Sequence, residues 1–127
     1  AEHFMAILVE GAESEQAAEL IARTIAASPL VKTAITGGDP NWGRIVSAAG
    51  YAEAKIEPDR TSLEICGVPI YRQGTPLEFD AAELSKRMKA QPEVDIRLRV
   101  GKGTGGAIFW SSDLTVQYVR FNSEYTT

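Results

Sequence analysis

The sequence has only one cysteine and one histidine among its 127 residues. Cys66 cannot form an internal disulfide, which fits a protein of the reducing cytoplasm. No histidine or basic cluster lies near Cys66 in the sequence, so a buried, inert thiol is favoured over a nucleophile. His3 has no second histidine to join it, so the sequence predicts no metal site. A Ser-His-Asp triad could exist only through His3 and is nearly excluded.

Long apolar runs and basic runs are also absent. No apolar run approaches the ~18 residues of a membrane-spanning helix. The net charge is −4, with 13 basic and 17 acidic residues and no basic stripe, so nucleic acid is not expected as a partner. Apolar residues make up 44% of the sequence and charged residues 24%, as in an ordinary globular domain. The length predicts one domain, residues 1–127, with a real hydrophobic core.

The first quarter of the sequence combines strand and helix patterns. Residues 4–10 are predicted to form a largely buried strand, and residues 14–27 a helix that Ser14 caps and Pro29 ends. The apolar run 30–35 is a second strand candidate. The residues expected to share one face of the first helix are Ala17, Leu20, Ile21 and Ile25.

A second helix is predicted to follow Gly37-Gly38. Asp39 is a good N-cap, Pro40 suits the first helical position and Gly50 suits the end. Gly43 stands early in this helix, where glycine costs about 1 kcal/mol relative to alanine, so close packing against its backbone is expected. The predicted buried face consists of Trp42, Ile45, Val46 and Ala49.

The second half of the sequence predicts more strands than helices. Asp80 and Glu83 resemble a capping pair for a helix over 81–90, with Leu84 and Met88 facing inward. Residues 94–100 alternate between apolar and charged side chains, which indicates a strand with one solvated face that includes Arg97 and Arg99. The other expected elements are strands at 61–66, 68–72, 107–110 and 114–121 and a turn at 74–76. The pattern favours an α+β domain, with a mixed, mostly antiparallel sheet and about three helices packed on it.

The glycine-rich stretch Gly101–Gly106 has the composition of a phosphate-binding loop without its spacing. A P-loop needs four residues between its first glycine and the Gly-Lys-Ser/Thr unit. The stretch also lies between two strands and does not open a helix, so a plain flexible hairpin is the favoured interpretation.

Two stretches are specific enough to indicate a family. The first runs from Ser28-Pro29-Leu30-Val31-Lys32-Thr33-Ala34 through Asp39-Pro40-Asn41-Trp42-Gly43-Arg44-Ile45 to Ala49-Gly50-Tyr51-Ala52. The second comprises Trp110-Ser111-Ser112-Asp113-Leu114-Thr115, Tyr118-Val119 and Asn122-Ser123-Glu124-Tyr125-Thr126-Thr127. Together with residues 4–12, they resemble the bifunctional ornithine acetyltransferase (glutamate N-acetyltransferase) family of arginine biosynthesis. The likeness spans nearly the whole chain and is looser over residues 53–93.

The resemblance implies an acyl-transfer chemistry whose nucleophile is not in this chain. In that family a precursor cleaves itself into α and β chains, and the cut exposes a threonine at the start of the β chain. This threonine carries the acetyl group from N-acetylornithine to glutamate, with its own terminal amine as base. The matching motif, the oxyanion-hole residues and a substrate-binding glutamate all fall upstream of Ala1.

The resemblance assigns two substrate contacts to this chain, Asn122 and Thr127. Asn122 offers both a donor and an acceptor, and Thr127 brings a hydroxyl to the amino-acid end of the substrate. Four residues of the first stretch are expected to have an architectural role and not a direct role in shaping the substrate pocket. They are Asp39, Asn41, Trp42 and Arg44. Departures from the usual family pattern at Glu2-His3, Val116-Gln117 and Glu124 touch neither predicted contact.

The resemblance also implies partners and a location. The α chain and the amino-terminal part of the β chain would complete the enzyme, and residues 1–52 would pack against that larger part. No cofactor or metal is implied, the expected location is cytoplasmic, and use of acetyl-coenzyme A stays open. Two alternatives also stay open: a non-catalytic scaffold or interaction domain, and a related self-processing amidohydrolase or aminopeptidase.

Overall fold

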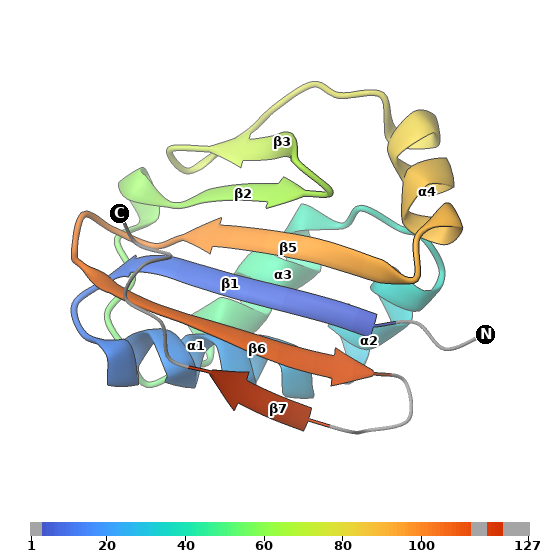
Figure 1. Ribbon diagram of the computed structural model, residues 1–127. Coiled ribbons are helices and arrows are strands. Elements are labelled where there is room, and N and C mark those ends of the chain that lie inside the picture. The colour runs from blue at the N-terminus through green and yellow to red at the C-terminus, as the bar shows by residue number, and fades with distance from the viewer. Residues whose placement is uncertain (1–3, 113–116, 121–127) are drawn as a thin grey trace.

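The computed structural model describes residues 4–112 in full and the backbone of residues 117–120. Figure 1 shows one twisted sheet with helices behind it. The helices are α1 (Glu15–Ala27), α2 (Pro29–Thr36), α3 (Trp42–Gly50), the 3-10 turn η1 (Pro58–Arg60) and α4 (Ala81–Ala90). The strands are β1 (Phe4–Ala12), β2 (Ser62–Ile65), β3 (Val68–Arg72), β4 (Thr75–Pro76), β5 (Glu93–Arg99), β6 (Gly105–Ser112) and β7 (Gln117–Arg120).

The sheet is mixed and mostly antiparallel, as the sequence predicts. Its strand order is β4-β3-β2-β5-β1-β6-β7. Only β1 and β5 pair in parallel among the described strands, and every other neighbouring pair is antiparallel. Helices α1, α2 and α3 cover one face, while a fourth helix, α4, lies beside the start of β5 (Figure 1). The prediction of about three helices on a sheet is therefore confirmed, with one more α-helix than expected.

The hydrophobic core lies between the sheet and its covering helices. Alternate residues of each central strand point toward the helices, because side chains on a strand change face at every residue. The largest fully buried side chains include Ile7, Ile21, Ile25, Ile45, Ile65, Ile96, Leu98 and Phe109. Burial of such apolar side chains stabilises a fold by about 1.5–3 kcal/mol each.

Three helix and strand predictions are confirmed with their local chemistry. The side chain of Ser14 accepts a hydrogen bond from the backbone N–H of Ala17 and caps α1, which ends before Pro29. The side chain of Asp80 accepts from the N–H of Glu83 and caps α4. Strand β5 shows the expected alternation between buried and exposed side chains. Ala17, Ile21 and Ile25 on the predicted face of α1 are buried, whereas Leu20 is 39% exposed.

The prediction of a strand over residues 30–35 is wrong, because these residues lie in helix α2. The Ser28 side chain accepts a hydrogen bond from the N–H of Val31, and Pro29 occupies the first turn. Serine at the cap and proline at the first position both favour a helix start. The buried residues Val31, Ala34 and Ile35 have the i, i+3, i+4 spacing of one helix face.

The N-cap predicted for the next helix is displaced by two residues. Asn41, not Asp39, caps α3, and its side-chain oxygen accepts from the N–H of Arg44 at 3.0 Å. Pro40 therefore precedes the cap and is not the first helical residue. The carboxylate of Asp39 instead accepts a hydrogen bond from the side-chain amide of Asn41 at 3.2 Å. Asn and Asp are similarly good caps, so local preference does not separate the two positions.

The strands predicted at 61–66 and 68–72 form a hairpin, β2–β3. Cys66 and Gly67 make its turn with φ of 52° and 79°, the left-handed pair of a two-residue hairpin loop. The turn predicted at 74–76 starts one residue earlier, at Gln73, which also has a positive φ. Thr75 and Pro76 themselves form the short edge strand β4.

The glycine-rich stretch is not a hairpin turn, contrary to the prediction. Strands β5 and β6 do not pair with each other, because β1 lies between them. The connecting chain therefore crosses the end of β1, where the N–H of Gly103 donates to the carbonyl of Gly11 at 3.0 Å. A side chain at Gly105 would collide with the backbone of Ser14. Close backbone contact thus explains the glycines without a phosphate ligand.

Candidate functional site

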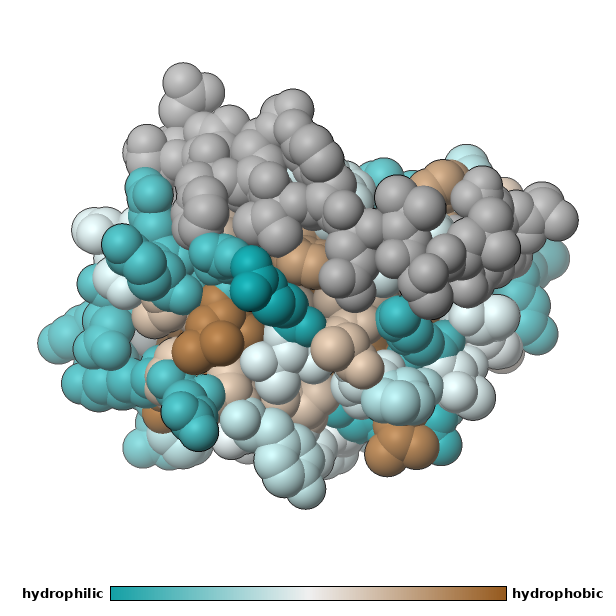
Figure 2. Space-filling view, turned by 90° about the horizontal axis from the view of Figure 1, so that it is seen from below, coloured by the Kyte–Doolittle hydropathy of each residue, from teal (hydrophilic) through white to brown (hydrophobic). Residues whose placement is uncertain are grey.

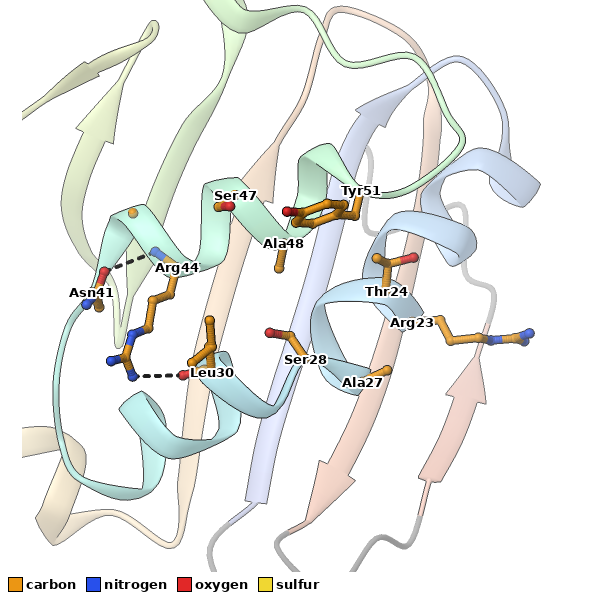
Figure 3. Close-up of a pocket in the computed structure, with 11 residues that line it drawn as sticks. Arg23, Thr24, Ala27, Ser28, Leu30, Asn41, Arg44, Ser47, Ala48 and Tyr51 are labelled. Atoms are coloured by element: carbon orange, nitrogen blue, oxygen red, sulfur yellow. Dashed lines mark hydrogen bonds between the residues drawn. The ribbon is translucent and has the colours of Figure 1, made fainter.

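A groove of about 720 Å³ opens between helices α1, α2 and α3 on the side of the molecule away from the sheet. Figure 3 shows its lining side chains, which come from α1, α2 and α3 and from residues that flank these helices. We call this hollow the helical groove. Its lining includes Arg23, Thr24 and Ala27 of α1, Ser28 and Leu30 at the start of α2, and Arg44, Ser47 and Ala48 of α3, with Asn41 and Tyr51 at the two ends of α3.

The local sequence explains how the helical groove forms. Ser28 ends α1 and caps α2, so the chain turns sharply between the two helices. Arg44 then joins α3 to α2, because its guanidinium Nη1 donates to the carbonyl oxygen of Leu30 at 3.1 Å. This bond gives Arg44 an architectural role, which the sequence favours.

The surface of the helical groove is apolar and partly exposed. Leu30 is 61% exposed and Tyr51 is 80% exposed. Figure 2 shows that hydrophobic residues also break the polar surface on the side seen from below in Figure 1. Gly43 lines the groove, and among the described residues a side chain placed there would come close only to the Asn41 side chain. Its backbone therefore has less packed against it than the sequence suggests.

The face of the sheet opposite the helices carries an ion pair whose carboxylate is buried. Glu10 of β1 is 5% exposed. Its carboxylate accepts from Nε of Arg97 at 2.9 Å and from Nη2 at 3.2 Å, and Nε of Arg99 lies 3.8 Å away. The hydrogen bond from Arg97 to Glu10 is the main reason that the pKa of Arg97 is raised. The predicted solvated face of Arg97 and Arg99 is thus also a structural link between β1 and β5.

Beside this pair, Glu93 and Asp95 project from β5 in the same direction. A hydrogen bond with Asp95 is the main cause that raises the pKa of Glu93, with burial and the negative charge of Asp95 adding to it. Such a shared proton is expected when two carboxyl groups lie close together. Both side chains are exposed, so the pair belongs to the solvated side of the sheet.

Cys66 is half-buried in the β2–β3 turn. Its thiol donates to the side-chain oxygen of Gln91 at 3.4 Å, and burial raises its thiol pKa. A raised pKa lowers the thiolate fraction, which agrees with an unreactive thiol.

Among the described residues, no group of three or more His, Cys, Asp or Glu side chains could hold a metal ion. No helix in the described part of the chain has the length and apolar character needed to cross a membrane.

The two predicted substrate contacts, Asn122 and Thr127, lie outside the described residues.

Among the residues expected to be architectural, Trp42 stacks on Tyr71 with ring centroids 5.1 Å apart. Asn41 caps and Arg44 bonds a carbonyl, so both have architectural roles, and both also line the helical groove. Asp39 bonds Asn41 and does not cap.

Sequence reasoning missed the helical groove and the role of Glu10. The groove depends on how three helices pack, which no local pattern gives. Glu10 carries a clearer signal, since a single acidic residue ends an otherwise apolar strand and a strand with two arginines follows later. Buried charges are nearly always paired, so that acid could have been assigned to those arginines.

Comparison with known proteins agrees with the fold and with the two sequence stretches. A family model described as the ArgJ family matches residues 1–127. The arginine biosynthesis bifunctional protein ArgJ of Rhodopirellula baltica is 65% identical over the whole chain, and that of Prochlorococcus marinus is 49% identical over 95% of it. These matches place the chain in a class of proteins named for arginine biosynthesis. The chain belongs to the ArgJ family.

A solved relative shares the architecture. The crystal structure of arginine biosynthesis bifunctional protein ArgJ from Bacillus halodurans matches with a TM-score of 0.85 and 34% sequence identity, over 89% of this chain and 53% of that chain. The chain spans 31% of the length of the two curated relatives.

Proposed function

We propose that this chain is the carboxy-terminal part of a glutamate N-acetyltransferase that moves the acetyl group from N-acetyl-L-ornithine to L-glutamate. The observation that supports this most strongly is the 65% identity over all 127 residues to a protein named for arginine biosynthesis. The proposed partners are the α chain and the amino-terminal part of the β chain of the same precursor. No cofactor is needed, and the proposed location is the cytoplasm.

The proposed reaction has two covalent steps. The hydroxyl of a threonine outside this chain attacks the acetyl carbonyl of N-acetylornithine and gives its proton to the threonine's own amine. The C–N bond then breaks, the proton goes to the leaving amine of ornithine, and an acetyl-threonine ester remains. The amine of glutamate attacks this ester and forms the C–N bond of N-acetylglutamate, and its proton passes to the threonine's own amine. The C–O bond breaks, and that proton then restores the threonine hydroxyl. Kinetics should be ping-pong, since ornithine leaves before glutamate reacts.

Within this chain, Asn122 and Thr127 are proposed to bind substrate. An amide and a hydroxyl suit the polar amino-acid end of N-acetylornithine or glutamate, because both can donate and accept hydrogen bonds. Residues 1–52, which include the helical groove, are proposed to pack against the larger part of the enzyme. The chain alone is proposed to be inactive.

The substrate assignment is tested by steady-state kinetics of the complete enzyme carrying Asn122→Ala. Loss of a hydrogen bond to a charged substrate should raise KM for N-acetylornithine by roughly tenfold or more. Ser123→Ala is the matched control and should change KM little. An unchanged KM for both substrates in Asn122→Ala would refute the assignment. Transfer by the 127-residue chain alone would refute its dependence on the rest of the enzyme.

A further inference from the structure

The hydroxyl of Ser111 is the one buried side-chain polar group without a hydrogen bond in the described part of the chain. Ser111 is 1% exposed, so bulk solvent does not reach this oxygen. A buried hydroxyl without a partner destabilises a fold, and buried polar atoms are nearly always bonded to protein or to ordered water. Ser111 therefore requires a partner that the described protein atoms do not supply.

The side chain of Ser111 belongs to the face of β6 that packs on the helices. Side chains alternate between the two faces of a strand, so Ser111 shares a face with Phe109 of the hydrophobic core. In the neighbouring strand β1, its partner is Met5, another core residue. A polar side chain thus occupies a position on this face where its neighbours are apolar.

A small cavity lies beside Ser111, where α2 covers the start of β1 and the end of β6 (Figure 1). The cavity offers about 20 Å³ to a water molecule. A site for one water needs roughly 10–15 Å³ on the same measure, whereas pockets for organic ligands begin at roughly 300 Å³. The space therefore suits a single water and excludes a substrate.

Helix α2 brings two more polar side chains to this cavity, Lys32 and Thr36. The hydroxyls of Thr24 and Thr33 each donate to the backbone carbonyl four residues earlier, but among the described residues the hydroxyl of Thr36 makes no such bond. Lys32 likewise has no ion pair with a described residue. A buried water makes about three hydrogen bonds, and Ser111, Thr36 and Lys32 can supply them.

Water fits these three side chains better than an ion does. The positive charge of Lys32 disfavours a metal cation at the cavity. Lys32 is also half-buried, so its ammonium group can reach solvent and needs no buried counter-ion. The hydroxyls of Ser111 and Thr36 can both donate and accept, which matches the hydrogen bonding of a neutral water.

We propose that this cavity is a hydration site, in which one ordered water bonds the hydroxyl of Ser111 and the polar side chains of α2. The water joins the helix layer to the sheet at the end of β6. It also explains why a serine is buried on a face that otherwise carries core residues. This inference does not depend on the proposed acetyl transfer.

The direct test is a crystal structure of the complete enzyme at a resolution that shows ordered waters. A water oxygen should lie roughly 2.7–2.8 Å from Oγ of Ser111, within hydrogen-bond distance of a side chain of α2. An empty cavity, or a protein side chain inside it, would overturn the proposal. A bromide soak identifies an anion by its anomalous signal, and bromide at this position would also overturn the proposal.

Ser111→Ala gives opposite results for a bonded and an unbonded hydroxyl. Loss of a bond to water should lower the equilibrium constant for folding about fivefold, whereas removal of an unpaired hydroxyl should leave it unchanged or raise it. Ser47→Ala, at an exposed position of α3, is the matched control and should not lower the constant, because alanine is the better helix former. Urea unfolding of the chain measures both variants. No loss in Ser111→Ala, or an equal loss in both, would overturn the proposal.

Discussion

At the scale of single residues, Glu10 has the most demanding environment. It is the one charged side chain that is buried among the described residues. Its bidentate contact with Arg97 compensates the loss of hydration, since an unpaired buried carboxylate would cost several kcal/mol. Arg97 itself keeps about half of its side-chain surface in solvent, so the pair is partly screened. The main effect of this pair is to join β1 to β5.

Glu10→Gln is predicted to lower the free energy of unfolding by about 1–2 kcal/mol, because two charge-assisted hydrogen bonds lose their charge. Urea unfolding of the chain followed by circular dichroism measures the change. Glu78→Gln, at an exposed position, controls for removal of one negative charge and should change stability by less than about 0.5 kcal/mol. Equal effects of the two substitutions would show that the buried pair contributes nothing.

Glu93 should make stability depend on pH. Its pKa is raised in the folded state by the hydrogen bond with Asp95, so that bond stabilises the fold below the ordinary glutamate pKa and is lost as the pH rises through the raised value. Glu93→Gln, whose amide donates at every pH, should therefore be more stable than the parent at pH 7 by about 0.5 kcal/mol and lose this advantage near pH 4. Chemical unfolding at a series of pH values measures it.

The control for Glu93 is the partner residue. In an Asp95→Asn background, the effect of Glu93→Gln on stability should change much less across the same pH range, because only burial then raises the pKa of Glu93. A pH-dependent effect as large as in the parent would show that Asp95 is not the main cause.

At the scale of elements, the sequence predicts those with a long, regular pattern and fails at short ones. Strand β5 and helix α4 follow from strict alternation and from the Asp80 cap. The run 30–35 fits both a short buried strand and one turn of helix, and the cap at Ser28 decides between them. Gly101–Gly106 has turn composition, but its partners are Gly11 and Ser14, far away in the sequence.

Asn41, which caps α3, is expected to stabilise the folded domain. Asn41→Ala should lower the free energy of unfolding by about 1 kcal/mol, because the N–H of Arg44 loses its acceptor. Asp39→Ala removes only the exposed bond to the Asn41 side chain and should cost less than about 0.5 kcal/mol. Urea unfolding of both variants compares them directly. A larger loss for Asp39→Ala would restore Asp39 as the effective cap.

At the scale of the whole molecule, the sequence predicts a mixed, mostly antiparallel sheet, but it does not predict the order of the strands. The placement of β1 between β5 and β6 depends on contacts between residues far apart in the chain, such as Glu10 with Arg97. The same limit applies to the helical groove, which three separate helices build. The predicted substrate contacts Asn122 and Thr127 come from likeness to a family, and they stay predictions.

The proposed function requires that this domain serves an acetyltransferase whose nucleophile lies outside it. The most direct measurement is peptide mass spectrometry of the complete enzyme after incubation with N-acetylornithine in the absence of glutamate. The acetyl group should be found on a threonine outside residues 1–127 and should disappear when glutamate is added. A stable or catalytically competent acetyl group on any residue of this chain, or no acetylated enzyme at all, would contradict the claim.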